Sequence, residues 1–223
     1  MVEKVFWDDP YLTRLDAAVA TVAGDQVTLD RTILYAFSGG QESDRGTIAG
    51  HPVLAARKDG RDIVYTLPAD HGLAPGQAVE LTLDWPRRHR LMRLHLAAEL
   101  MLEIVTRDLP GVVKIGAHIA EDKARLDFAW DQPVTPLLPG FRDRAMAIVL
   151  ADQPIVSAFS DPAAQRRYWE IAGFARVPCG GTHLRRTAEI GEITLKRRNT
   201  GKGKERIEIT VGDPAVAAGE PHP

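Results

Sequence analysis

The 223-residue chain is 44% hydrophobic and carries a formal net charge of -2 at neutral pH. A chain of this length can bury one large core or two modest ones, and its length favours two domains. The charge argues against an indiscriminate nucleic-acid binder, because such proteins are normally strongly basic.

Cysteine usage and hydropathy indicate the compartment. The single cysteine, Cys179, excludes an intramolecular disulfide, and the N-terminal sequence MVEKVFWDDPYLTRLD has charges where a signal peptide needs an apolar run. No stretch approaches the ~20 consecutive apolar residues of a membrane span. We therefore expect a cytoplasmic protein without a membrane partner.

Residues 1–85 are expected to be all-β. Short runs of β-forming residues alternate there with Gly, Asp and Pro, at the spacing typical of a small barrel or sandwich. The expected strands are residues 17–24, 26–30, 32–37, 62–67 and 78–85.

The chain changes character near residue 85, and residues 86–223 are expected to form a second, α+β domain. Residues 87–106 contain no Gly or Pro and are rich in Leu, Met, Ala and Glu, which predicts a helix of some twenty residues. Further strands are expected at 111–120, 124–130, 168–177, 189–198 and 206–211, and a second helix at 140–152. These blocks favour an α+β arrangement, with a frayed tail from residue 212.

A histidine and a carboxylate lie one turn apart in the expected long helix. His95 and Glu99 occupy positions i and i+4, so both project from one face. Cys179 and His183 are also four residues apart, across two glycines. These four side chains offer N, O, S and N donors, a set that suits zinc. A His–Glu pair is also common as a hydrogen-bonded pair, and a buried cysteine often only packs, so both interpretations stay open on spacing alone.

Clusters of basic residues flank this candidate site. Phosphates need several cationic contacts to hold a backbone in register, so the clusters favour a polyanionic ligand. A set of solvated surface charges is the alternative. The candidate contacts are Arg87, Arg88, Arg90, Lys196, Arg197, Arg198, Lys202 and Lys204.

Several separated motifs resemble those of the alanyl-tRNA editing domains, both within alanyl-tRNA synthetases and in the freestanding AlaX-type hydrolases. CGGTHL followed by TAEIG, within residues 179–191, resembles their C-x-x-x-H signature, and DWPRRHRLMRLH, residues 84–95, is similar to the segment that leads into their H-x-x-x-H zinc motif. LDRTILYAFSGGQESDRGTI, residues 29–48, resembles the family's Gly-Gly-Gln segment, and GKGKERIEI, residues 201–209, its closing strand. The resemblance spans residues 3–211.

This resemblance implies an N-terminal β-barrel domain over residues 1–85 and a zinc-binding editing domain over 86–223, related in fold to the editing region of threonyl-tRNA synthetases. It implies an aminoacyl-tRNA deacylase, independent of ATP and with one Zn²⁺ per chain. We expect the protein to be a monomer, although the sequence does not constrain its oligomeric state. Its partner would be tRNA(Ala) that wrongly carries serine or glycine. The alternative is a zinc-stabilised RNA-binding or partner-binding module that kept the scaffold with altered or lost catalysis.

The resemblance also suggests residue roles. Gly39, Gly40 and Gln41 would face the substrate, and Gln41 or Thr182 would hydrogen-bond the serine hydroxyl or the substrate's amino group. Polar groups that bind the extra hydroxyl would explain discrimination against alanine. Gly180 and Gly181 would either donate amides to the developing oxyanion or only shape the turn.

Glu99 departs from the family pattern, which has a second histidine at this position. If His95, Glu99, Cys179 and His183 all ligate, the zinc site becomes formally neutral and a weaker Lewis acid. Alternatively, three ligands leave an open position and Glu99 acts as the catalytic general base on a water. In the third interpretation, the substitution has weakened metal binding and changed the activity.

Overall fold

The computed structural model describes residues 1–214, so most of the tail that was expected to fray lies outside the described residues. The described chain divides into two compact units. Unit 1 comprises Met1–Ser38 and Glu42–His89, and unit 2 comprises Gly39–Gln41 together with the described residues from Arg90 onward.

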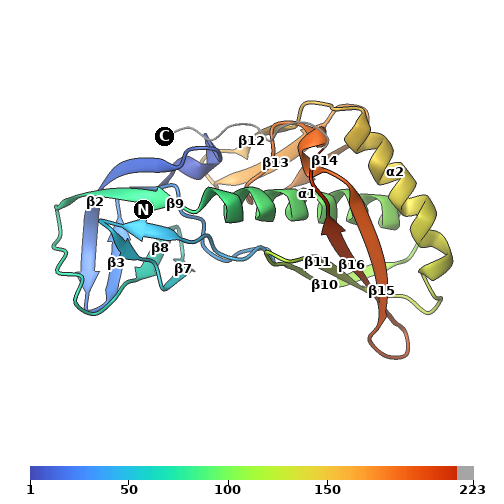
Figure 1. Cartoon of the computed structure of the whole chain (residues 1–223), viewed down its shortest axis with the longest axis horizontal. Helices are drawn as coiled ribbons and strands as arrows, with labels where there is room; N and C mark the ends of the chain where they lie inside the picture. Colours follow the sequence, from blue (N-terminus) through green and yellow to red (C-terminus); the bar gives the residue numbers. More distant parts are fainter. Residues whose placement is uncertain (215–223) are drawn as a thin grey trace. The chain divides into compact units, whose positions relative to one another are not determined.

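Unit 1 is built around a seven-stranded sheet in the order β6-β5-β9-β2-β3-β8-β7 (Figure 1). Its strands are β2 (Arg14–Ala23), β3 (Gln26–Leu29), β5 (Gly46–Ile48), β6 (His51–Pro52), β7 (Ala55–Asp59), β8 (Asp62–Thr66) and β9 (Ala78–Leu83). Neighbouring strands are antiparallel, and alternate residues such as Val79 and Leu81 of β9 enter the core. Two short strands, β1 (Glu3–Lys4) and β4 (Arg31–Thr32), pair in parallel.

Closure of this sheet into a barrel is not confirmed. In the described part of the chain, the end strands β6 and β7 do not pair with each other. The sheet of unit 1 is therefore curled and open, a half-barrel. The strands expected at 17–24, 26–30, 62–67 and 78–85 are confirmed as β2, β3, β8 and β9.

The strand expected at 32–37 is wrong. Only Arg31–Thr32 pairs as a strand, whereas residues 33–36 are buried without belonging to a sheet. Side chains supply the hydrogen bonds that a ladder would have given: Asp44 Oδ2 accepts from the Tyr35 amide at 2.6 Å, and the Tyr65 hydroxyl donates to the Leu34 carbonyl at 2.7 Å. The apolar run indicated burial, which a well-bonded irregular segment satisfies equally.

The long helix α1 (Trp85–Asp108) is confirmed and is slightly longer than expected. The side chain of Asp84 caps its first turn by accepting from the Arg87 amide at 3.2 Å. Leu91, Leu94 and Ala97 are all fully buried, so the middle of the helix is enclosed on every side, whereas its last turn, Thr106–Asp108, is exposed. The boundary between the two units falls within α1, after His89.

Unit 2 contains two antiparallel sheets and a second helix, α2 (Leu138–Leu150). One sheet has the order β10-β11-β16-β15, with β10 (Val113–Ile119), β11 (Ala124–Ala129), β15 (Ile193–Asn199) and β16 (Lys204–Val211). The other has the order β12-β13-β14, with β12 (Val156–Asp161), β13 (Arg166–Ile171) and β14 (Ala175–Pro178).

The expected mixture of helices and sheets is confirmed for unit 2, including the C-terminal hairpin of β15 and β16. The single strand expected at 168–177 is wrong, because the chain turns back at Gly173, whose φ is +74°, and forms β13 and β14. Within the described residues, neither α1 nor α2 has the length and apolar character needed to cross a membrane.

Arg88 and Asp44 form a buried ion pair inside unit 1. Both side chains have 0% exposure. Arg88 Nε donates to Asp44 Oδ1 at 2.9 Å, and its other nitrogens donate to the carbonyls of Pro10 and Ile33. Every polar group of the pair is thereby satisfied by the segments that surround it.

Replacing Arg88 with methionine should therefore destabilise the protein strongly, because Asp44 would remain as an uncompensated buried charge. We expect the free energy of unfolding to fall by about 3 to 5 kcal/mol, measured by urea unfolding followed by circular dichroism. The control is Arg14→Ala, which removes a pair with Glu80 whose side chains are 58% and 50% exposed; it should change stability by less than about 1 kcal/mol. A loss for Arg88→Met no larger than that of the control would contradict the prediction.

Candidate metal and substrate site

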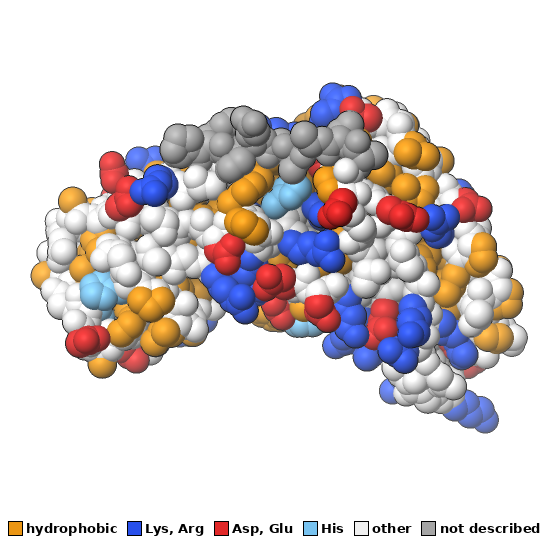
Figure 2. Space-filling model, in the orientation of Figure 1, with side chains coloured by type: hydrophobic (Ala, Val, Ile, Leu, Met, Phe, Trp, Pro, Cys, Tyr) orange, Lys and Arg blue, Asp and Glu red, His pale blue; other side chains and the backbone are white. Residues whose placement is uncertain are grey.

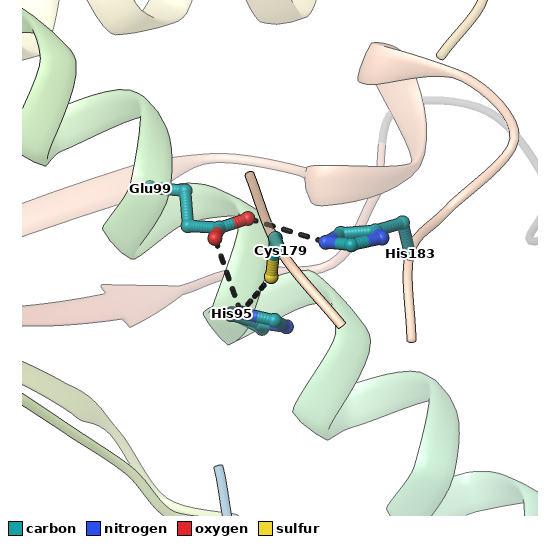
Figure 3. Close-up of side chains that lie close together, drawn as sticks. All are labelled: His95, Glu99, Cys179 and His183. Atoms are coloured by element: carbon teal, nitrogen blue, oxygen red, sulfur yellow. Dashed lines mark hydrogen bonds and ion pairs between the residues drawn. The ribbon is translucent and has the colours of Figure 1, made fainter. Parts of the chain in front are cut away.

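Four potential metal ligands converge in unit 2 (Figure 3). His95 and Glu99 lie one turn apart on α1, and Cys179 and His183 lie in the segment that follows β14. Glu99 Oε1 is 3.4 Å from His95 Nε2, and Glu99 Oε2 is 3.3 Å from His183 Nε2. Cys179 Sγ is 3.6 Å from His95 Nε2, and one donor atom from each residue lies within 4.8 Å of the others. The spacing of the two pairs in the sequence thus indicated a real cluster.

Backbone and side-chain contacts hold each ligand in place. The Cys179 amide donates to the Arg167 carbonyl at 2.9 Å, which continues the β13–β14 pairing up to the cysteine. Ser157 Oγ lies 3.3 Å from His183 Nδ1, so the other ring nitrogen is directed to Glu99. The Gly181 amide donates to Cys179 Sγ at 3.5 Å, a contact that stabilises a thiolate. Ser157 is not recognisable from the sequence, because no motif surrounds it and only the folding of β12 (Val156–Asp161) brings it to the histidine.

The electrostatics of the cluster favour charged groups despite burial. Burial would lower the pKa of His95, but the Glu99 carboxylate and the Cys179 thiolate raise this pKa well above its usual value. Burial would raise the pKa of Glu99, but His95 and His183 hold it well below its usual range. Burial and Glu99 would raise the pKa of Cys179, yet the two histidines bring it below its usual value. The cysteine is therefore biased toward the thiolate, the form that binds metals.

The cluster fits a metal ion. Among the described residues, His95 Nδ1, His183 Nε2 and Glu99 Oε2 are buried atoms without a hydrogen-bond partner. His183 Nε2 and Glu99 Oε2 face each other across the centre of the cluster (Figure 3). Buried polar atoms without partners are costly, and a shared cation would satisfy these two at once. His95, Glu99, Cys179 and His183 could therefore bind a metal.

The Gly-Gly-Gln loop joins this site. Although its flanking residues belong to unit 1, Gly39–Gln41 belongs to unit 2. The Gly40 carbonyl accepts from the Ile119 amide at 2.7 Å, and Gln41 forms a parallel bridge with Ile119 at the end of β10. Gly40 has a φ of +91°, and a Cβ there would lie 2.8 Å from the Ala117 carbonyl oxygen, so only glycine allows this close approach.

Gln41 and Thr182 form a buried polar pair beside the ligands. Gln41 Nε2 donates to Thr182 Oγ1 at 3.0 Å, and the two residues are 0% and 1% exposed. Gln41 Oε1 has no hydrogen-bond partner among the described residues. A Cβ on Gly181 would lie 2.9 Å from this oxygen and 2.2 Å from His95 Cε1. The pair therefore offers an unused acceptor next to the candidate metal cluster.

The structure separates the basic residues that the sequence grouped together. Arg88 is fully buried against Asp44, and the Arg87 side chain is 7% exposed and paired with Glu42 at 2.7 Å. The guanidinium groups of these two arginines are therefore engaged inside unit 1, which does not favour their assignment as RNA contacts.

The basic residues of unit 2 have different surroundings. Arg90 donates to the Glu121 carbonyl at 3.3 Å, while Arg197 pairs with Glu205 and Arg198 with Glu208. The remaining candidates, Lys196, Lys202 and Lys204, are exposed.

Comparison with known proteins places these residues in a family. Residues 170–208, which include Cys179 and His183, match the family described as the threonyl and alanyl tRNA synthetase second additional domain. The chain is 31% identical to the alanyl-tRNA editing protein AlaX-M of Pyrococcus horikoshii, over 94% of this chain and 97% of that protein. It is 30% identical to AlaX-M of Methanosarcina barkeri, over 96% of this chain and 100% of that protein. It is also 32% identical to the alanine–tRNA ligase of Ignicoccus hospitalis, over 94% of this chain but only 26% of that enzyme. With this coverage and the clustered motifs, the chain belongs to the family of AlaX-M alanyl-tRNA editing proteins.

Proposed function

We propose that this protein is a trans-editing deacylase that hydrolyses mischarged tRNA(Ala), with Ser-tRNA(Ala) as its main substrate and Gly-tRNA(Ala) as a second one. It would act in the cytoplasm, as a monomer and without ATP. The observation that carries the proposal is the His95–Glu99–Cys179–His183 cluster, in a chain whose full-length relatives are named alanyl-tRNA editing proteins. We assign the chemistry to an editing domain over 86–223 and substrate selection partly to a barrel-type domain over 1–85.

Zinc is the metal that the donor set favours. Ligands around a tetrahedral zinc, at ~2.0–2.3 Å from the ion, are about 3.3 to 3.6 Å apart. The three separations that join Glu99, Cys179 and the two histidines are 3.3, 3.4 and 3.6 Å. Soft thiolate and imidazole donors also favour zinc over calcium or magnesium. When bound, zinc would supply Lewis acidity to the reacting ester and water.

Glu99 is best assigned as the fourth ligand rather than as a free general base. Its two carboxylate oxygens face His95 and His183 at 3.4 and 3.3 Å, so neither is directed away from the cluster. With Glu99 and the Cys179 thiolate as anions, a bound divalent ion would be formally neutralised. A less positive centre polarises a carbonyl less, so the surrounding residues must contribute more to the rate.

Gln41 and Thr182 are assigned to substrate selection. Because Gln41 Nε2 donates to Thr182 Oγ1, the threonine hydroxyl keeps its own proton for another acceptor. The unpaired Gln41 Oε1 can accept from a hydroxyl or an ammonium group. A serine ester would satisfy these groups, whereas an alanine ester would leave one of them unpaired, which is the most effective basis for discrimination.

The glycines of the CGGTHL segment have separate roles. Gly181 donates its amide to the Cys179 thiolate and leaves no room for a side chain against His95, so it holds two ligands in place. Gly180 is exposed, and a Cβ there would meet nothing within 4 Å. Of the two, Gly180 is therefore assigned to backbone contact with the ester, together with Gly39 and Gly40 on the opposite loop.

The purified protein should release serine from Ser-tRNA(Ala) much faster than alanine from Ala-tRNA(Ala), in a metal-dependent reaction. In this hydrolysis water adds to the ester carbonyl, the ester C–O bond breaks, and the 3′-terminal ribose oxygen takes a proton. Release of amino acid is measured for the wild type, for a chelated sample and for Glu99→His. Glu99→His should retain activity, because it restores a more positive metal site. No release by the wild type, with activity only in Glu99→His, would instead support a catalytically altered binding module.

Loss of a ligand should lower zinc content without unfolding the protein. We expect Cys179→Ala and His183→Ala to reduce zinc affinity by roughly 10-fold or more, since even supporting contacts of metal ligands are worth 10- to 100-fold. Zinc per chain is measured by elemental analysis after dialysis, with circular dichroism to monitor folding. Thr182→Val is the matched control, because it lies in the same segment and offers no cluster ligand. Full zinc occupancy in either ligand variant would refute the ligand set.

Thr182→Val should reduce discrimination between serine and alanine while preserving the zinc. Valine keeps the shape of threonine but removes the hydroxyl that bonds Gln41. Losing a hydrogen bond to the substrate hydroxyl is worth roughly 1 to 3 kcal/mol, or about 5- to 150-fold in kcat/KM for serine. The measurement is the ratio of kcat/KM for Ser-tRNA(Ala) to kcat/KM for Ala-tRNA(Ala). An unchanged ratio would show that residues other than Thr182 recognise the serine hydroxyl.

A further inference from the structure

The outward face of the β10-β11-β16-β15 sheet is strongly basic. Side chains alternate between the two faces of a sheet. On one face, Leu126, Phe128, Ile207 and Ile209 are buried in unit 2. The register places five basic residues of β11, β15 and β16 on the other face, where Arg198 lies opposite Arg206, and the Lys123–Glu208 ion pair adds a cation from the turn before β11. We call this set the basic face; its cations are Lys123, Arg125, Lys196, Arg198, Lys204 and Arg206.

Two carboxylates on this face lie largely covered by the cations. Asp127 pairs with Arg125 and, at 2.6 Å, with Arg206. Its side chain is 14% exposed, whereas those of the two arginines are 33% and 29% exposed. A ligand that approaches the sheet therefore meets guanidinium groups before it meets this carboxylate.

Glu208 repeats this arrangement on the next strand. It pairs with Lys123 at 2.9 Å and with Arg198 at 3.0 Å. Its side chain is 13% exposed, against 41% and 53% for the two cations. The strands of the face carry five cations and two carboxylates, a surplus of three positive charges. The turn that supplies Lys123 also carries the exposed Glu121 and Asp122, so the surplus over the whole surface is two, in a chain whose net charge is -2.

In the described chain, Lys196 and Lys204 are not held in ion pairs, although Lys196 lies across from Glu208 in the register. Both residues are exposed. Lys202 extends the charge onto the turn between β15 and β16. Figure 2 shows Lys and Arg side chains gathered around this end of unit 2, where the hairpin projects.

The basic face begins beside the candidate site. Ile119, the last residue of β10, bonds to the Gly40 carbonyl and bridges to Gln41, which in turn bonds Thr182 next to the ligand His183. None of the six cations lies on β10 itself. They follow the neighbouring β11, whose Ala124 pairs with Ile119 and whose span Ala124–Ala129 is ~20 Å long at about 3.3 Å per residue. A nucleic-acid duplex carries on the order of ten phosphates over that length. The face thus leads from the ligand cluster along a path that matches a phosphate backbone in charge and extent.

We propose that the basic face is the docking surface for the phosphodiester backbone of the duplex RNA next to the acceptor end of the substrate. That this RNA is tRNA(Ala) rests on the proposed function. Contacts to phosphates fix register and orientation but read no sequence. The face positions the aminoacylated end at the cluster, and selection between amino acids is left to the site.

The test compares two double variants of the full chain, with zinc bound. Lys196→Ala/Lys204→Ala removes two cations of the face that make no ion pair, and Arg57→Ala/Lys58→Ala removes two exposed cations of β7 in unit 1. Binding of uncharged tRNA(Ala) is followed by fluorescence anisotropy at several salt concentrations. The first variant should weaken binding roughly 10-fold or more and lower the slope of log K against log salt by about 2. The control should leave the slope unchanged.

An unchanged slope in Lys196→Ala/Lys204→Ala, or an equal fall in the control, would overturn the proposal. Deacylation of Ser-tRNA(Ala) by the same proteins separates this result from the proposed function. A reduced slope in a protein without deacylase activity would support the face and reject the function. If the wild type deacylated Ser-tRNA(Ala) but the salt slope of Lys196→Ala/Lys204→Ala were unchanged, the proposed function would be supported and the basic face rejected as the docking surface. Binding to anionic phosphatidylserine vesicles is measured for the same proteins. If the wild type bound these vesicles but not tRNA, and Lys196→Ala/Lys204→Ala lost the vesicle binding, the RNA assignment would also be overturned.

Discussion

A helix whose middle is buried on every side must provide a partner for each charged group that it carries there, and α1 carries several. Arg88 meets Asp44 with no exposed surface on either side chain. Arg93 is buried two turns before Glu99 and donates to the Ile190 carbonyl at 3.0 Å. His95 and Glu99 meet each other and the Cys179–His183 segment. Since unpaired buried charges cost several kcal/mol, these requirements fix which segments lie against the helix.

The same constraint explains how the site is assembled. Cys179 and His183 follow the β13–β14 hairpin. Their segment is distinguished by the polar contacts, here called the polar ring, that these two side chains make with His95 and Glu99 of α1. The Gly-Gly-Gln loop completes the ring, because Gly40 has no side chain to separate its backbone from Ala117. Gly181 has the same role against His95. Close approach of backbone, which only glycine permits, is therefore as important here as the ligands themselves.

Much of the site and of the fold was predictable from the sequence, for identifiable reasons. His95 and Glu99 are one turn apart on a helix, so local periodicity was enough to place them together. Cys179 and His183 lie in an irregular segment, where only the resemblance of the CGGTHL motif pointed to them. The strand prediction for 32–37 was wrong because an apolar run indicates burial but not the pattern of hydrogen bonds. The side chains that bond this segment, Asp44 and Tyr65, are distant from it in sequence. A run of arginines looks the same in the sequence whether it faces solvent or a carboxylate, so the covered positions of Arg87 and Arg88 could not be predicted. The role of Ser157 depends on the β12–β13 pairing, which has no local signal.

The paired carboxylates of the basic face have a consequence for conformational entropy. Asp127 holds Arg125 and Arg206, and Glu208 holds Lys123 and Arg198, so four long side chains are already restricted before any ligand arrives. Immobilising such a side chain on binding costs about 0.5 to 1.5 kcal/mol. The carboxylates thus lower the net positive charge of the face, but they also preorganise its side chains for binding. Lys196 and Lys204, which lack such partners, keep the freedom to follow irregularities in whatever lies against the sheet.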